Sequence, residues 1–104
     1  MFVILWEFEV KPGSEKCFEK AYGPNGTWVQ LFQRDSHFRG TQLQRDPTRS
    51  LYYFTIDFWD SEPAYKQFLT ANQALYSELD RSHEELTSKE RLIVSFTITS
   101  SSAP

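Results

Sequence analysis

Asp57 is the side chain in this 104-residue sequence that is best placed to act as a general base. It lies in a strand-like aromatic segment, where alternation puts it on one face with Thr55 and Trp59. A carboxyl group among aromatic side chains has a raised pKa unless a cation pairs with it, and a general base needs such a pKa. The alternative is an ion pair with Arg45 across a hairpin, and both interpretations are open.

A second set of polar side chains falls on the apolar face of a segment with helical periodicity. Over residues 61–86, Asn72 and His83 lie close to the meridian that carries the large apolar side chains. One interpretation is a cavity between this helix and a sheet, in which a few polar groups orient a ligand. The other is that Asn72 is hydrogen-bonded inside the core and that His83 stabilises the C-terminal end of the helix.

The elements that must position these residues follow the order β-α-β-β-α-β. Strands are predicted at residues 2–10, 38–45, 51–59 and 92–98, with Trp6 on the first of them. A first helix begins after Ser14, is broken at Pro24 and ends near Gln33, and a second runs from Ser61 to about Leu86. This order is typical of an α+β, ferredoxin-like fold with a four-stranded antiparallel sheet and both helices on one face. Residues 1–98 form one domain, and residues 99–104 form a flexible C-terminal tail.

The third predicted strand is apolar on both faces, which bears on assembly. Helices cover only one face of such a sheet, and a large uncovered aromatic face is unusual for a monomer. We therefore expect a homodimer in which two sheets pack face to face. The face opposite Asp57 consists of Tyr52, Phe54, Ile56 and Phe58.

Composition and charge exclude several classes of protein. Eleven basic and fourteen acidic residues give a net charge of -3, and no Lys/Arg cluster exceeds a pair, so nucleic acid is not an expected partner. No segment resembles a signal peptide or a membrane span, and the single Cys17 indicates a reducing compartment, so we expect a cytoplasmic protein without a membrane partner. Metal-binding and nucleotide-binding motifs are missing, so neither a metal nor a cofactor is expected.

The sequence resembles the antibiotic biosynthesis monooxygenase family over about residues 2–98. The resemblance rests on the order of elements, on Gly-Pro-Asn-Gly-x-Trp at residues 23–28, on Gly40-Thr41, and above all on Trp-Asp-Ser-Glu-Pro-Ala-Tyr at residues 59–65. It implies a dimeric α/β barrel built from two ferredoxin-like protomers. Members of the family include cofactor-independent oxygenases that act on polyketide aromatics, quinol oxygenases and haem-degrading enzymes.

The resemblance also implies roles for individual residues. In members that oxidise aromatics, the tryptophan and tyrosine of the junction line the substrate cavity, which implies this role for Trp59 and Tyr65. Thr55 and Gln44 stand where those members have an asparagine and a histidine. Haem-degrading members need an asparagine on the first strand, where this chain has Trp6, and a histidine on the second helix that it lacks, so haem degradation is disfavoured.

Two functions are open at this point. One is a cofactor-independent monooxygenase that oxidises an electron-rich aromatic, a polyketide phenol or a hydroquinone, with O₂. The other is a non-enzymatic dimer that binds a small hydrophobic ligand between the same walls. For the enzyme, the catalytic residues are Asp57 as the base and Asn72 as a hydrogen-bond donor. A small aromatic ligand would contact Trp6, Thr55, Trp59, Tyr65 and His83.

Overall fold

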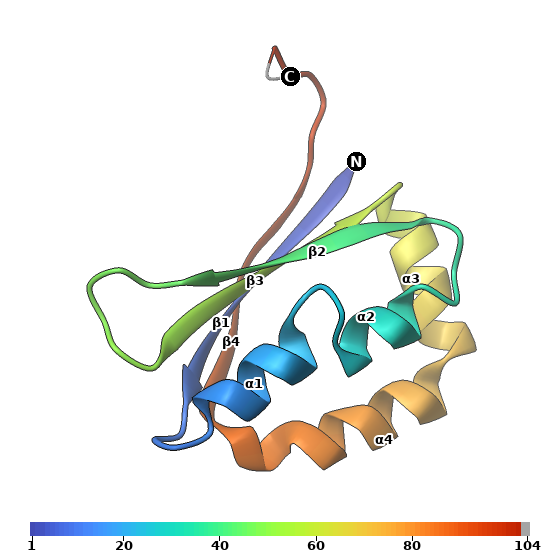
Figure 1. The fold of residues 1–104 in the computed structure, drawn as a ribbon. Coiled ribbons are helices and arrows are strands. Elements are labelled where there is room, and N and C mark those ends of the chain that lie inside the picture. Colours follow the sequence, from blue (N-terminus) through green and yellow to red (C-terminus); the bar gives the residue numbers. More distant parts are fainter. Residues whose placement is uncertain (103–104) are drawn as a thin grey trace.

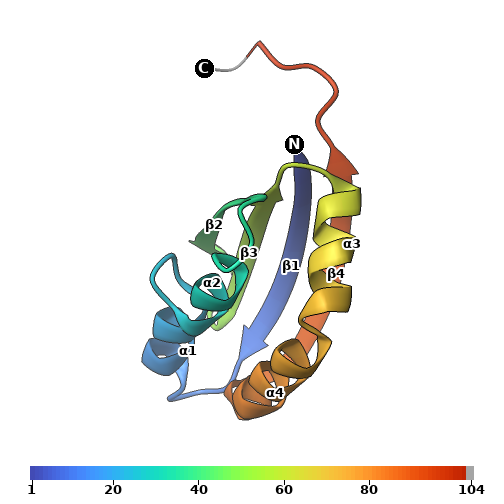
Figure 2. The same cartoon turned by 90° about the vertical axis from the view of Figure 1, so that its right-hand side faces the viewer.

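Four strands form one antiparallel sheet in the order β2-β3-β1-β4 in the computed structural model, which describes residues 1–102. The strands are β1 (Phe2–Val10), β2 (Phe38–Arg45), β3 (Tyr52–Trp59) and β4 (Thr87–Thr97). The helices are α1 (Glu15–Tyr22), α2 (Thr27–Phe32), α3 (Glu62–Ala71) and α4 (Gln73–His83), followed by the short 3-10 helix η1 (Glu84–Leu86). All the α-helices lie on one side of the sheet (Figure 1), with α1 and α2 on the β2 side and α3 and α4 on the β4 side (Figure 2). The predicted α+β, ferredoxin-like fold is therefore confirmed.

The first helical region is broken where the sequence predicts it. The segment between Tyr22 and Thr27 contains Gly26, where a Cβ atom would lie 2.2 Å from the carbonyl oxygen of Ala21. Only glycine fits such a close approach of the chain to itself. The break lets α2 change direction and brings Trp28 beside Tyr22, with their ring centroids 6.0 Å apart.

The second helical region differs from the continuous helix expected over residues 61–86. It starts as predicted, because the Ser61 hydroxyl accepts a hydrogen bond of 3.2 Å from the Ala64 N–H. It is interrupted at Asn72, whose side-chain Nδ2 donates to the Phe68 carbonyl oxygen at 3.0 Å while its backbone leaves helical geometry (φ -120°, ψ 24°). Asparagine side chains compete with helical hydrogen bonds in this way. The single helical phase that put Asn72 and His83 on one face is therefore wrong.

Strand β4 begins earlier than predicted, at Thr87 instead of Leu92. Its ladder with β1 pairs Phe8 with Glu90, so a charged stretch that lacks strand propensity is part of the sheet. Pairing with a neighbouring strand outweighs intrinsic preference here. Residues 98–102 follow without regular structure, and residues 103 and 104 of the predicted tail lie outside the described residues.

The side of the sheet that faces the helices builds the core. Along β3, Tyr53, Thr55, Asp57 and Trp59 are buried while the residues between them are half-buried, as alternation predicts. Trp59 has no exposed surface. Its ring centroid lies 4.9–5.7 Å from those of four other aromatic side chains: Phe32, Phe38, Tyr65 and Phe68.

The other face of the sheet has no covering layer among residues 1–102 (Figure 2). We call it the open face, and on β3 it carries half-buried Tyr52, Phe54, Ile56 and Phe58. Exposed apolar side chains also lie along the edge strand β4 and just beyond it, and of these Val94 and Phe96 share the open face, because they pair with Leu5 and Val3. Five of them are 38–48% exposed: Leu92, Ile93, Val94, Phe96 and Ile98.

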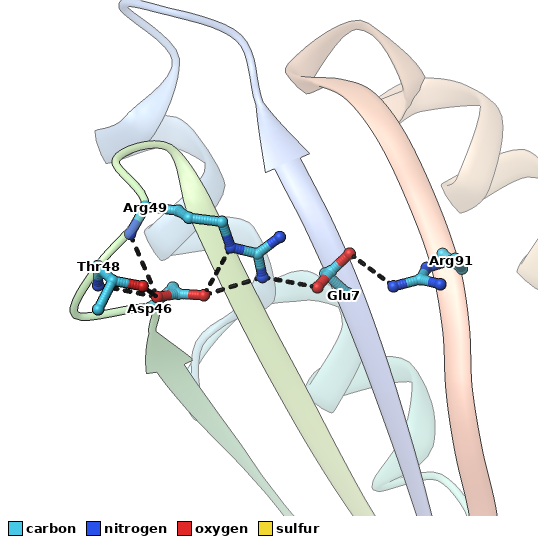
Figure 3. A network of polar contacts seen from close by, with 5 residues as sticks. All are labelled: Glu7, Asp46, Thr48, Arg49 and Arg91. Carbon is cyan, nitrogen blue, oxygen red and sulfur yellow. Dashed lines mark hydrogen bonds and ion pairs between the residues drawn. The ribbon is translucent and has the colours of Figure 1, made fainter.

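One end of the open face carries a ladder of alternating charges (Figure 3). Arg49 Nη2 lies 2.8 Å from both Asp46 Oδ2 and Glu7 Oε2, and Arg91 Nη2 lies 3.3 Å from Glu7 Oε1. The hydrogen bond from Arg49 lowers the pKa of Glu7, and the backbone N–H of Thr48 is the main cause that lowers the pKa of Asp46 to about 2. The ladder joins the β2–β3 loop, β1 and β4 with little net charge.

Candidate functional site

A small pocket lies between the sheet and the helices. Its cavity volume is about 40 Å³, and it is partly open to solvent. A space of this size holds a few water molecules. The sheet contributes Trp6 and Phe8 of β1, Thr41 of β2, Thr55 and Asp57 of β3, and Glu90 of β4; the helices contribute Tyr22, Trp28, Phe32 and Tyr76.

Asp57 is the buried acid of this pocket, with 8% of its surface exposed. Thr41 Oγ1 donates a hydrogen bond of 2.7 Å to Asp57 Oδ1. Burial raises the pKa of Asp57 to about 6, and the hydrogen bond from Thr41 opposes that rise. At pH 7 the carboxyl group is therefore mostly ionised, and it can take up a proton more readily than a solvated aspartate.

The alternative ion pair between Asp57 and Arg45 does not form. In the β2–β3 register, Thr41 stands opposite Asp57 and Arg45 stands opposite Tyr53. The Arg45 guanidinium carbon lies 5.6 Å from the centroid of the Tyr53 ring, which gives this cation an aromatic partner instead. Asp57 is left with a hydroxyl as its neighbour across the ladder.

This register runs unbroken from Arg45 to Gly40 and ends at a bulge in β2. Phe38 pairs with Trp59 and Gly40 pairs with Phe58, so Arg39 is the extra residue between them. Gly40 adopts φ +134°, a conformation that favours glycine. Because of the extra residue, Phe38 and Thr41 both face the helices although three positions separate them.

Aromatic rings form the wall opposite Asp57. The Trp28 ring meets Tyr76 edge-on at 5.0 Å between centroids and lies 5.9 Å from Phe32. Burial raises the pKa values of Tyr22 and Tyr76, so both phenols stay protonated at neutral pH. Trp28 Nε1 lies near enough to the Tyr22 hydroxyl to oppose the rise in the Tyr22 pKa. This nitrogen is buried and makes no hydrogen bond of normal geometry within residues 1–102. It is a donor that a ligand could use.

Glu90 is the second acid of the pocket and lies on its solvent-exposed side. Partial burial raises the pKa of its carboxyl group, and the negative charge of Asp80 raises it further. The lining that the structure describes contains no lysine, arginine or histidine. The pocket therefore carries negative charge at neutral pH.

Three of the predicted site residues, Trp6, Thr55 and Asp57, meet in this pocket. Trp59 and Tyr65 contact each other with ring centroids 5.4 Å apart, but they lie beside the pocket and do not line it. Asp57 is still close enough to Tyr65 that its charge adds to the effect of burial, which raises the Tyr65 pKa to about 12.

Asn72 and His83 also lie outside the pocket lining. Asn72 ends α3, as described above. His83 Nε2 lies 2.7 Å from Thr27 Oγ1, and the His83 ring packs 5.9 Å from Tyr22 and 6.2 Å from Trp28. These two residues support the walls of the pocket from outside.

Seven lining residues were not predicted as site residues: Phe8, Tyr22, Trp28, Phe32, Thr41, Tyr76 and Glu90. Tyr22, Trp28, Phe32 and Tyr76 follow helical apolar spacing, and Phe8 follows strand alternation; neither pattern distinguishes a pocket wall from a core position. Glu90 was missed because its strand was predicted to begin two residues later. The sequence singled out Thr41 only as part of the Gly40-Thr41 pair, and its place beside Asp57 depends on the register of the β2–β3 hairpin.

The described residues 1–102 hold no group of three or more His, Cys, Asp or Glu side chains that could bind a metal ion. No helix among them is both long enough and apolar enough to cross a membrane.

The family model for antibiotic biosynthesis monooxygenases matches residues 1–75. The chain belongs to the antibiotic biosynthesis monooxygenase family. The resemblance inferred from residues 59–65 is thereby confirmed. The matched part contains every lining residue of the pocket except Tyr76 and Glu90.

Solved structures with this fold cover nearly the whole chain. SnoaB from Streptomyces nogalater, described as a cofactor-independent oxygenase, superposes with a TM-score of 0.74 at 17% identity over 99% of this chain and 97% of its own. A Deinococcus radiodurans protein named for the same family gives a TM-score of 0.76 at 8% identity, over 100% and 98%. MhuD, with two manganese protoporphyrin IX molecules in each active site, gives 0.73 at 18% identity over the full length of both chains. At these identities the likeness shows the fold alone, and a search of the curated proteins gave no match.

Proposed function

We propose that this protein uses O₂ to oxidise a small electron-rich phenol or hydroquinone without a cofactor, in the pocket around Asp57. The observation that supports this proposal is the buried carboxylate of Asp57, held by Thr41 at 2.7 Å and surrounded by aromatic rings. Deprotonation is the step that prepares such a substrate, because a phenolate gives an electron to O₂ more readily than a phenol. Asp57 is the lining group with a pKa near 6 that can take the proton.

The reaction balances without a second reductant. One phenol and one O₂ give one quinone and one water: four electrons leave the ring, one oxygen atom of O₂ enters the product and the other becomes water. A hydroquinone gives a hydroxyquinone and water in the same way. A phenol with a pKa of about 10 lies about 4 pKa units above Asp57, which makes the proton transfer uphill by ~5 kcal/mol. Donors aimed at the developing oxyanion in a dry site offset such a difference. Trp28 Nε1 and the Thr55 hydroxyl are placed in the lining to do this.

The size of the pocket limits the substrate. A cavity of roughly 150 Å³ holds benzene, whereas this one measures about 40 Å³. Even a single ring must therefore displace part of the wall, and a fused polycycle needs a much larger rearrangement. Four residues that the sequence predicted as ligand contacts or donors lie behind that wall: Trp59, Tyr65, Asn72 and His83. They would reach a ligand only after such a movement.

Haem is a poor fit for this chain. A porphyrin is far larger than a 40 Å³ cavity, and Asp57 and Glu90 offer no attraction to its carboxylate groups. The likeness to MhuD is therefore extended to the fold only, and haem degradation stays disfavoured.

A second copy of the chain is the proposed cover of the open face. Half-buried aromatic and aliphatic side chains of β3 continue into exposed ones on β4. Their combined apolar surface is typical of an interface between proteins. The charge ladder at one end is internally paired, so contact with an identical face does not bring unpaired like charges together.

The proposed reaction is tested by O₂ uptake. Single-ring hydroquinones and phenols are offered to the protein at pH 7.5, with an anaerobic control, and the product is identified as the quinone. We expect Asp57→Asn to remove the uptake while Glu84→Gln, which neutralises an exposed acid outside the pocket lining, leaves it unchanged. Saturable binding of the same compounds with no O₂ uptake would replace the enzyme with the non-enzymatic ligand-binding protein.

A further inference from the structure

The lining of the pocket is acidic and aromatic and has no cation within the part of the chain that the structure describes. Asp57 lies buried on one side, and Glu90 lies on the exposed side. Six aromatic side chains complete the lining: Trp6, Phe8, Tyr22, Trp28, Phe32 and Tyr76. Carboxylates and the faces of aromatic rings both attract positive charge, and their combination is how proteins hold ammonium groups.

We propose that this pocket selects small arylalkylamines, holding their protonated amino group between Asp57, Glu90 and the aromatic rings, and that it rejects arylalkyl carboxylates. The proposal rests on the proposed function in one respect, because it takes the pocket around Asp57 to be the ligand site. It adds the charge of the ligand, which neither the family nor the reaction specifies.

The neighbouring titratable groups do not supply a competing positive charge. Tyr22 and Tyr76 stay protonated and neutral, since burial raises their pKa values. Burial lowers the pKa of His83 behind the wall, which favours its neutral form at pH 7. Asp80 adds negative charge near Glu90.

The groups on the other side of the pocket are also neutral or acidic. Thr41 is the hydrogen-bond partner of Asp57, and Tyr65 is neutral because burial raises its pKa to about 12. Arg45 is held over the Tyr53 ring instead of reaching Asp57. An anion that enters therefore meets two acids with no compensating cation, whereas an ammonium group meets two opposite charges.

The size of the pocket supports the same ligand. An ammonium group is about as large as a water molecule, so it fits in a 40 Å³ cavity. An aromatic ring enters the same cavity only if it displaces part of the wall. The ring of the ligand would then lie in the partly open mouth of the pocket. An amine therefore gains its ionic contacts before the wall has to move.

Three phenols that differ in the charged group at the end of a two-carbon chain test this inference. Tyramine is cationic, 4-ethylphenol is neutral, and 3-(4-hydroxyphenyl)propanoate is anionic, and each carries a two-carbon chain on the same ring. Isothermal titration at pH 7.5 in low salt should give tyramine an affinity about tenfold above that of 4-ethylphenol. The propanoate should bind more weakly than both. Equal affinities, tighter binding of the propanoate, or no binding of tyramine would overturn the inference.

Charge variants separate the pocket from the general acidity of the protein, whose net charge is -3. We expect Glu90→Gln to weaken tyramine binding by roughly fivefold or more and to leave 4-ethylphenol unchanged. Glu84→Gln removes the same charge from an exposed site outside the lining and should change neither affinity. Equal losses in the two variants would assign the preference to long-range attraction and overturn the proposed site.

The outcome is distinguishable from that of the proposed function. A preference for tyramine without O₂ uptake supports the amine site and contradicts the oxygenase. Uptake of O₂ with no charge preference among the three phenols supports the oxygenase and contradicts the amine site.

Discussion

The hydroxyl of Thr41 donates to the carboxylate of Asp57 at 2.7 Å, from the position directly opposite on the neighbouring strand. Burial and this hydrogen bond act on the same pKa in opposite directions, since burial favours the neutral acid and the hydrogen bond favours the ion. The two effects can therefore be separated by changing one residue at a time.

Removing the hydroxyl should raise the pKa of Asp57. We expect Thr41→Val to move it above about 6, because burial then acts without opposition. The measurement is the titration of the Asp57 carboxyl carbon by NMR, and the acid limb of O₂ uptake should shift to higher pH with it. Thr41→Ser keeps a hydroxyl and should behave like the wild type. A midpoint that stays in place or falls in Thr41→Val would contradict the assigned role of the hydrogen bond.

The burial of Asp57 should make the protein less stable as the pH rises. The folded-state pKa of about 6 lies above the ordinary value of 3.8, so the folded state binds the proton more tightly than the unfolded state. Stability is then greatest below pH 3.8 as far as this group is concerned, and it falls between pH 4 and 6 by up to about 3 kcal/mol.

Asp57→Asn removes this dependence and keeps an oxygen that accepts from Thr41. The difference in unfolding free energy between variant and wild type, from urea titrations at pH 4 to 8, should grow in favour of the variant as the pH rises. The pH dependence that the other acids contribute is the same in both proteins and therefore cancels in this difference. A difference that is flat across the range would show that Asp57 is not a strained, buried acid.

Sequence patterns predicted the strands that carry the site better than the helices that close it. Strict alternation over residues 52–59 placed Thr55 and Asp57 together on one face, because a strand has only two sides, and the family resemblance indicated that this face looks toward the helices. Helical phase carries over only while the helix is unbroken. The hydrogen bond from Asn72 to Phe68 accompanies a break between α3 and α4, so the two helices do not share one helical phase. The prediction that His83 lies on the same face as Asn72 was therefore wrong.

The partners of Asp57 depend on long-range pairing, which a single sequence does not specify. The register of the β2–β3 hairpin, in which Arg45 pairs with Tyr53, decides that Thr41, and not Arg45, comes near Asp57. The β1–β4 ladder likewise brings Glu90 to the pocket from a segment with weak strand propensity. Both contacts are consequences of register, and register is set by the whole sheet.

Asn72 should contribute to stability through the break between α3 and α4. Asn72→Leu removes the donor to the Phe68 carbonyl, and we expect a loss of about 1 kcal/mol in unfolding free energy. Gln73→Leu, a change at an exposed neighbour, is the control and should have little effect. Unchanged stability together with weaker ligand binding would instead return Asn72 to the donor role predicted from the sequence.

A charge on the open face should prevent assembly. We expect Ile56→Asp to dissociate or unfold the proposed homodimer, because an unpaired carboxylate buried between two sheets costs several kcal/mol. Gln67→Asp introduces the same charge on the exposed side of α3 and should leave the assembly intact. Sedimentation that shows a stable wild-type monomer of 12.2 kDa at micromolar concentration would contradict the dimer.

The edge position of β4 has a consequence for how the chain behaves in a cell. Among the described residues, β4 pairs on one side only, with β1, and its C-terminal half is apolar and exposed. Such an edge is a template for another extended chain, and unguarded edges lead to aggregation. Two features limit this risk in β4: Ile93 is a bulge residue without a partner in β1, and Lys89 and Arg91 are charged. The regular, uncharged part of the edge is therefore limited to the last few residues of the strand. A newly made chain would be most prone to misassociate through this strand, and its yield in soluble form would then depend on how fast the proposed homodimer forms.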